Sequence, residues 1–210
     1  MLEITYEYLE QMIQSGHVAH QYAWDHYEEL NSRICVRTLY GPPSPYLGIL
    51  AAGHITPAKD RKLMTNTKRK RYLRYELDEN GQIIRIRAMK DYSVVDCTYH
   101  IFRLNGVTYA RSFFEEKKIP YDDRIFAIRY DNGRPCSFAI TQKNYLCMDF
   151  YEYPQRDVVR TICYLYLAGW ETTKPEYRRS RNVPMGTAGS PVVIETFEEP
   201  YLHFDLLDLQ

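Results

Sequence analysis

Three Asn-Gly pairs divide the middle of the chain and constrain its fold more than any other feature. They stand at 80–81, 105–106 and 132–133, and each is flanked by short apolar and aromatic runs. Asn and Gly adopt the positive φ that tight hairpins need, so each pair predicts two antiparallel strands joined by a turn. The break at 154–156 predicts a fourth hairpin. The stretch from about 71 to 167 therefore predicts one long antiparallel meander.

The hairpins and the flanking sequence together predict about eight to ten strands. Eight of these strands belong to the hairpins: 72–77, 83–87, 94–104, 107–114, 124–130, 136–141, 145–153 and 158–167. Further candidate strands are 34–40, 46–52 and 192–194. The intervals between the turn glycines are similar in length, which is the mark of a repeated hairpin unit.

The first 32 residues have a helical period instead. Thr5 is a suitable N-cap for a short helix with Leu9 and Met12 on its apolar side, and Gly16 is placed to end it. A second amphipathic helix is predicted over 18–31. The expected fold class is therefore α+β: a curved open antiparallel sheet or partial barrel, with two short N-terminal helices packed on one face.

Length and composition favour a single domain covering residues 1–210. With 45% hydrophobic residues, the chain can bury a sizeable core. We divide it into a helical segment (1–32), the antiparallel sheet (33–168), a long basic loop (169–191) and an acidic C-terminal segment (192–210).

Charge and cysteine content predict a cytoplasmic protein without membrane association. The 27 basic and 27 acidic residues balance, so no overall field attracts the chain to nucleic acid or membranes. No apolar run approaches the roughly 20 residues of a spanning helix, and the acidic start does not resemble a signal peptide. An odd number of cysteines without a C-x-x-C pair indicates free thiols, mostly buried in strands. They are Cys35, Cys97, Cys136, Cys147 and Cys163.

Several predicted strands alternate arginine with apolar residues. Arg85 and Arg87 flank Ile86, and Tyr109 shares a face with Arg111. We expect this Arg- and Tyr-bearing face to be the solvated, functional side of the sheet, with the apolar side turned to the helices.

A basic segment adjoins the first strand of the meander. Seven basic residues and one acid lie between residues 59 and 71. The chain also contains 20 tyrosines, a residue type favoured at protein interfaces. The residues that we predict to contact a partner are Lys68, Arg69, Lys70, Arg71, Tyr72, Arg85, Arg87, Tyr109, Arg111 and Arg129.

The turn Tyr130-Asp131-Asn132-Gly133-Arg134 resembles the core of the YD-repeat (Rhs-type) β-hairpin arrays, in which Tyr-Asp is closely followed by Gly-Arg. Proteins of that family form large shells around toxins, and this chain is much too short for that. In general character it is similar to the small toxin-immunity proteins of bacteria. That resemblance implies a non-enzymatic protein-recognition module that blocks a protein partner.

The sequence contains no recognisable catalytic or cofactor motif. A Gly-x-Ser-x-Gly elbow, a P-loop, a dinucleotide glycine motif, HExxH and a zinc-ribbon spacing are all missing. The paired acids at 115–116 and 122–123 suit a solvated turn better than acid/base chemistry. We therefore predict no catalytic residue, no cofactor and no metal, and leave enzymatic activity open with a preference against it.

Three alternatives remain open. A small-ligand binder or enzyme would use the concave face of the sheet, lined by Tyr99, Arg111 and Arg129. A nucleic-acid binder would hold phosphates on the basic segment. His17 and His20 stand one helical turn apart and could share a metal, although the simpler interpretation is two surface histidines.

Overall fold

The computed structural model describes residues 6–41, 65–68, 70–90, 93–114, 118–132, 134–143, 145–155, 158–167, 176–178, 183–185 and 192–200. Two helices open the chain, α1 (Tyr6–Asp25) and α2 (Tyr27–Ser32). The strands are β1 (Arg37–Gly41), β2 (Arg71–Leu77), β3 (Ile83–Lys90), β4 (Ser93–Leu104), β5 (Val107–Phe113), β6 (Pro120–Asp131), β7 (Arg134–Gln142), β8 (Tyr145–Gln155), β9 (Val158–Leu167), β10 (Glu176–Arg178), β11 (Val183–Met185) and β12 (Val192–Pro200).

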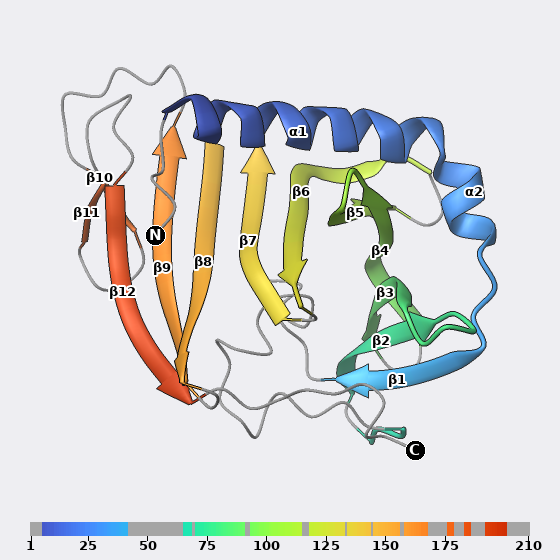
Figure 1. The fold of residues 1–210 in the computed structure, drawn as a ribbon. Helices are drawn as coiled ribbons and strands as arrows, with labels where there is room; N and C mark the ends of the chain where they lie inside the picture. The colour runs from blue at the N-terminus through green and yellow to red at the C-terminus, as the bar shows by residue number, and fades with distance from the viewer. Residues whose placement is uncertain are drawn as a thin grey trace.

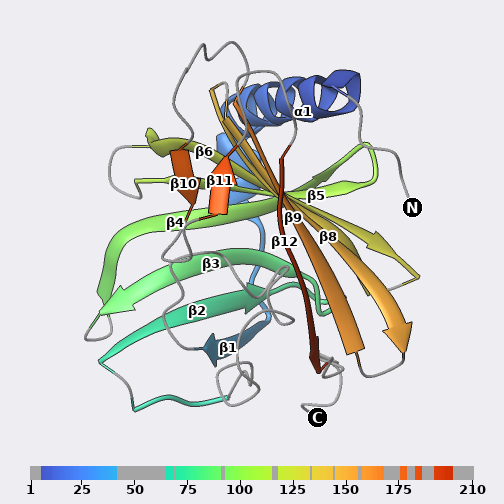
Figure 2. The same ribbon diagram turned by 90° about the vertical axis from the view of Figure 1, so that its left-hand side faces the viewer.

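Ten of these strands form one antiparallel sheet in the order β1-β2-β3-β4-β5-β6-β7-β8-β9-β12, and β10 pairs separately with β11. The predicted meander is thus confirmed, and among the described strands the sheet does not close, because β1 and β12 stand at opposite ends of the order. Figure 1 shows α1 lying across the sheet. Figure 2 shows the sheet bending beneath α1, with β2 and β3 on one side of the bend and β8 and β9 on the other.

The turn residues adopt the backbone conformations for which their sequence is suited. Gly81 has φ +73°, and both Asn105 (φ 50°) and Gly106 (φ 77°) lie in the left-handed region, as a tight two-residue hairpin requires. Asn132 begins the next turn with φ 49°. The Asp78 carboxylate accepts hydrogen bonds from the backbone N–H groups of Asn80 and Gln82 at 2.9 and 2.8 Å, which closes the β2–β3 turn.

The predicted end of the first helix at Gly16 is wrong, because α1 runs without interruption to Asp25. Gly16 instead permits close helix–sheet contact. A Cβ atom at this position would lie 2.2 Å from Oγ1 and 2.9 Å from Cβ of Thr141 on β7. Glycine is thus required here by packing and not by helix termination.

Two other boundaries differ from prediction. Residues 34–36 precede the first strand, which begins at Arg37. The predicted basic loop contains the short strands β10 and β11. The strand predicted over 46–52 lies outside the described residues, and the division of 1–210 into segments of one domain stays a prediction.

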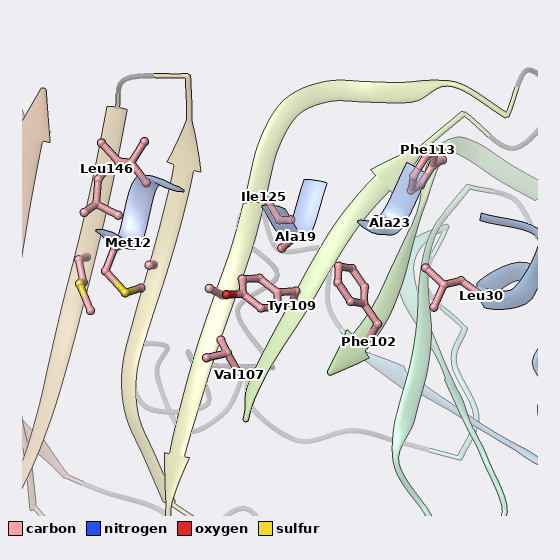
Figure 3. Packing of buried hydrophobic residues seen from close by; sticks show 14 of the residues in the cluster. Met12, Ala19, Ala23, Leu30, Phe102, Val107, Tyr109, Phe113, Ile125 and Leu146 are labelled. Atoms are coloured by element: carbon pink, nitrogen blue, oxygen red, sulfur yellow. The ribbon is translucent and has the colours of Figure 1, made fainter. Parts of the chain in front are cut away.

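The helices pack on the sheet through one cluster of buried apolar residues (Figure 3). Ala19 and Ala23 have no exposed surface, so their small side chains bring α1 close to the strands. The larger members extend the cluster from α1 and α2 to β4–β8: Met12, Ile13, Tyr27, Leu30, Phe102, Val107, Tyr109, Phe113, Ile125, Leu146 and Met148. Burial of each large apolar side chain contributes roughly 1.5–3 kcal/mol, which holds the helices on this face.

The opposite face, on the inside of the bend, is also buried. Tyr75 and Ile86 have no exposed surface, and Phe126 and Ile128 are each 2% exposed. The ring of Phe126 lies 6.0 Å from that of Tyr99 and 6.2 Å from that of Phe138. Where the burial of the strands is described, the sheet is therefore covered on both sides, and the prediction of one solvated face is wrong.

Two predictions from composition are partly tested. Cys35, Cys97, Cys136 and Cys147 are free thiols, and Cys97 and Cys147 are buried. Within the described part of the chain, neither helix has the combined length and apolar character needed to cross a membrane.

Candidate functional site

A row of directly paired residues crosses the helix-covered face of the sheet. The row, called the polar row below, consists of Thr38, Glu76, Arg85, His100, Arg111, Ile125 and Thr141. Residues directly opposite one another on neighbouring strands share a face. Apart from Ile125, every member carries a polar or charged side chain.

Glu76 and Arg85 form the charged end of the row. Arg85 Nε donates to Glu76 Oε2 at 2.6 Å, while Arg87 and Arg74 approach Oε1 at 2.9 and 3.0 Å. Burial alone would raise the pKa of Glu76, but the hydrogen bond from Arg85 and the three positive charges lower it below its ordinary value. Arg85 also donates to the backbone carbonyls of Asn31 and Arg33, at the end of α2. The guanidinium thus fixes α2 to the sheet.

His100 lies between the two arginines of the row and is 1% exposed. The ring of Tyr27 is 5.3 Å away and that of Phe113 is 5.6 Å away. Burial, and then the charge of Arg85, lower the pKa of His100 to about 4. The imidazole is therefore neutral near pH 7.

Arg111 has no exposed surface. Its Nη1 donates to the Arg124 carbonyl at 2.6 Å and lies 3.3 Å from Oδ1 of Asp122, whereas Nε and Nη2 have no hydrogen-bond partner. Burial lowers the pKa of Arg111 against the influence of Asp122 and Asp123. Asp122 also pairs with Arg124 at 2.5 Å, so this acid fixes the start of β6 and does not project as a free catalytic carboxylate.

A pocket of about 210 Å³ lies at the Thr141 end of the row. Its lining comes from α1, β6, β7 and the turn after β7: Gly16, His17, His20, Asp123, Ile125, Thr141 and Lys143. The two histidines singled out from the sequence therefore do line one site. Among the described residues, however, no group of three or more His, Cys, Asp or Glu is arranged to hold a metal ion.

Four exposed basic residues lie together where β2 begins and β3 ends. Lys68, Lys70, Arg71 and Lys90 are all exposed, and Arg71 is paired directly with Lys90. We call these four residues the basic edge. Figure 2 shows the adjoining strands β2 and β3, which lie away from α1.

The predicted contact residues divide into two groups. Lys68, Lys70 and Arg71 are exposed, and their role in partner binding stays a prediction, while Arg69 lies outside the described residues. The prediction that the remaining residues form an exposed surface is wrong: Tyr72, Arg85, Tyr109 and Arg111 are buried, and Arg87 and Arg129 are half-buried. The physical reason is that these side chains share the face that carries the helix-packing cluster.

The predicted concave ligand site is not assembled as expected. Tyr99 is paired with Ser112, and Arg111 is paired with His100, so Tyr99 and Arg111 lie on opposite faces of adjacent strands. Arg129 donates from Nη2 to the Met12 sulfur at 3.9 Å, beneath α1. The grouping of these three residues on one surface is therefore wrong.

Sequence reasoning missed Glu76, His100 and Thr141 as members of one row. A usable signal exists for Glu76, which is the one acid within the otherwise basic and apolar β2. A charge in such a setting is usually paired when buried.

Comparison of the chain with models of protein families, with curated proteins and with solved structures found no match. The resemblance to YD-repeat hairpins accordingly stays a prediction from the sequence.

Proposed function

We propose that the protein is a non-enzymatic recognition module that binds an acidic surface of a protein partner through the basic edge. The observation that carries the proposal is the exposure of Lys68, Lys70, Arg71 and Lys90 together at one end of β2 and β3. Clustered charges steer association with an oppositely charged partner and set specificity.

Strands β2 and β3 carry further positive charge beyond the basic edge. Arg74 and Arg87 lie on the same two strands, and Glu76 is the carboxylate that both contact. Three arginines around one glutamate leave a net charge of +2 in this cluster. The finer proposal is that the partner is a bacterial toxin that the module blocks.

The test is a pair of matched double variants. K70E/R71E reverses two charges of the basic edge, and the control R103E/K118E reverses two exposed charges elsewhere. Both purified variants and the unaltered protein are used to capture partners from the source lysate, and association with the captured protein is measured at low and physiological salt. We expect K70E/R71E to lower the association rate roughly tenfold or more at low salt and the control to leave it unchanged.

Equal binding by both double variants would refute the basic edge as the contact. Nuclease-sensitive capture with a steep salt dependence would favour the nucleic-acid alternative instead. A toxin encoded beside this gene is the first candidate partner, and protection from that toxin in cells tests the finer proposal.

A further inference from the structure

We propose that the pocket between α1 and strands β6 and β7 binds a small anion, either a carboxylate or inorganic phosphate. This site is separate from the basic edge, because its lining comes from residues 16–20, 123–125 and 141–143. The proposal therefore does not depend on the proposed recognition function.

The size of the pocket sets the class of ligand. Its volume of about 210 Å³ is far above the roughly 10–15 Å³ that one water needs. It is also below the roughly 300–1,000 Å³ of sites for drug-sized ligands. A small anion with a few waters fits these limits.

Thr141 supplies an unused hydrogen-bonding group in the lining. Its side chain is 4% exposed, and its Oγ1 has no hydrogen-bond partner in the protein. A buried hydroxyl without a partner is costly, and a ligand oxygen would remove that cost. Gly16 lines the pocket next to this hydroxyl, and any larger residue there would place its Cβ atom 2.2 Å from Oγ1.

The other polar groups of the pocket are two histidines, a lysine and an aspartate. His17 Nε2 lies 3.0 Å from the Lys143 carbonyl, so this nitrogen donates there, and Nδ1 can donate to an anion only when the imidazole is protonated. The Lys143 side chain is 79% exposed and its ammonium lies 3.6 Å from Asp123, a distance that leaves it able to turn toward an anion. Asp123 is the one acid of the lining.

A positive charge also stands behind the lining. Arg111 is paired with Ile125, which is paired with Thr141. His20 is the group that senses this charge: burial, then Arg111, and more weakly His17, lower its pKa, while Asp123 raises it. A bound anion would oppose the effect of Arg111, so it should raise the pKa of His20.

The probes are sodium acetate and sodium phosphate, with sodium chloride at matched ionic strength as the reference. Imidazole NMR signals of the full chain report on His17 and His20, and calorimetry reports the dissociation constant. We expect one or both anions to shift these two signals and to raise the pKa of His20. An effect of acetate alone identifies a carboxylate site, and an effect of phosphate alone identifies a phosphate site.

The decisive variant is Thr141→Val, which removes the hydroxyl and keeps the shape. Because the hydroxyl has no partner in the protein, we expect the melting temperature to stay the same or rise while the dissociation constant increases about tenfold. Thr108→Val, on a half-buried threonine outside the pocket, is the control. Lys143→Gln, at an exposed position, should weaken binding severalfold without affecting folding.

Two results would overturn the proposal. One is the absence of any specific shift of the His17 and His20 signals with either anion. The other is unchanged binding in both Thr141→Val and Lys143→Gln, which would place the anion elsewhere on the protein.

Discussion

Arg85 and Arg111 occupy equivalent places in the polar row, one on each side of His100, yet their surroundings differ. Arg85 uses all three of its nitrogens: one bonds Glu76, and the others bond the carbonyls of Asn31 and Arg33. Arg111 uses one nitrogen and leaves two without partners, although it is the more deeply buried of the two.

The two arginines therefore have different roles: the charge of Arg85 is used to hold the fold together, and the charge of Arg111 is only partly used. A buried arginine whose donors are all engaged holds elements together, here α2 on β3, and its loss leaves several groups unpaired. A buried arginine with unpaired donors stabilises the fold little and keeps a positive potential in its neighbourhood. The Arg85 half of the row (Thr38, Glu76 and Arg85) therefore holds α2 on the sheet, and the Arg111 half (Arg111, Ile125 and Thr141) adjoins α1 and the pocket.

The most severe test of the Arg85 half is Glu76→Gln. The substitution removes the charge that compensates three arginines, so we expect the free energy of unfolding to fall by roughly 3–5 kcal/mol. Urea unfolding of both proteins measures this change in free energy. Glu79→Gln, at an exposed position in the β2–β3 turn, is the matched control and should change stability by less than about 0.5 kcal/mol. A small effect at Glu76 would mean that the cluster is solvated.

His100, which lies between Arg85 and Arg111, should make the stability of the protein depend on pH. Its pKa in the folded state is about 4, below the ordinary 6.5, so the unfolded chain takes up a proton at a higher pH than the folded chain does. Stability should therefore fall by about 3 kcal/mol as the pH drops from 6.5 to 4. The measurement is the pH dependence of urea unfolding for the original protein and for His100→Gln.

The difference between these two curves isolates His100, because the other histidines are common to both proteins. Glu76 is also common to both, and its lowered pKa places its own loss of stability at pH values below its ordinary 4.5. Identical slopes between pH 6.5 and 4 would show that His100 titrates normally.

The features that could be predicted from the sequence are those that depend on local chemistry. Hairpins depend on local chemistry, so Asn105-Gly106 and the alternation around it predict strands β4 and β5 nearly to the residue. The amphipathic pattern likewise predicts that the N-terminal helices pack on the sheet.

The face that those helices cover could not be predicted in the same way. The alternation of side chains along each strand places Arg85 and Arg111 on one face of the sheet and Ile86 and Ala110 on the other. It does not indicate which face packs against a helix, and in this protein residues on both faces are buried. The cluster around Glu76 joins β2 and β3 to the end of α2, and the pocket joins α1 to β6 and β7. Such contacts depend on register and on close approach at Gly16, which no local pattern reveals.

Gly16→Ala measures how tightly α1 is seated on the Arg111 half. Alanine favours a helix by up to about 1 kcal/mol over glycine. The new methyl group would nevertheless overlap Oγ1 and Cβ of the buried, β-branched Thr141. We expect a net loss of about 1–2 kcal/mol in unfolding free energy. The double variant Gly16→Ala/Thr141→Ala should recover part of it, and a stabilised single variant would show that α1 can move away.

Replacing each arginine with methionine, which keeps a long flexible side chain, tests whether Arg85 and Arg111 differ in this way. Arg111→Met should change the free energy of unfolding by no more than about 1 kcal/mol, because the lost charge had two unpaired nitrogens and Asp122 keeps Arg124. Arg85→Met should cost at least about 2 kcal/mol more, since two carbonyls of the α2 end lose their donors. Removing Arg111 should also raise the pKa of His20, which burial and then this arginine lower, and an NMR titration measures that change. Equal destabilisation by the two variants, together with an unchanged pKa of His20, would mean that the Arg111 guanidinium is as fully engaged as that of Arg85. The pocket would then lack the positive potential that favours binding of an anion.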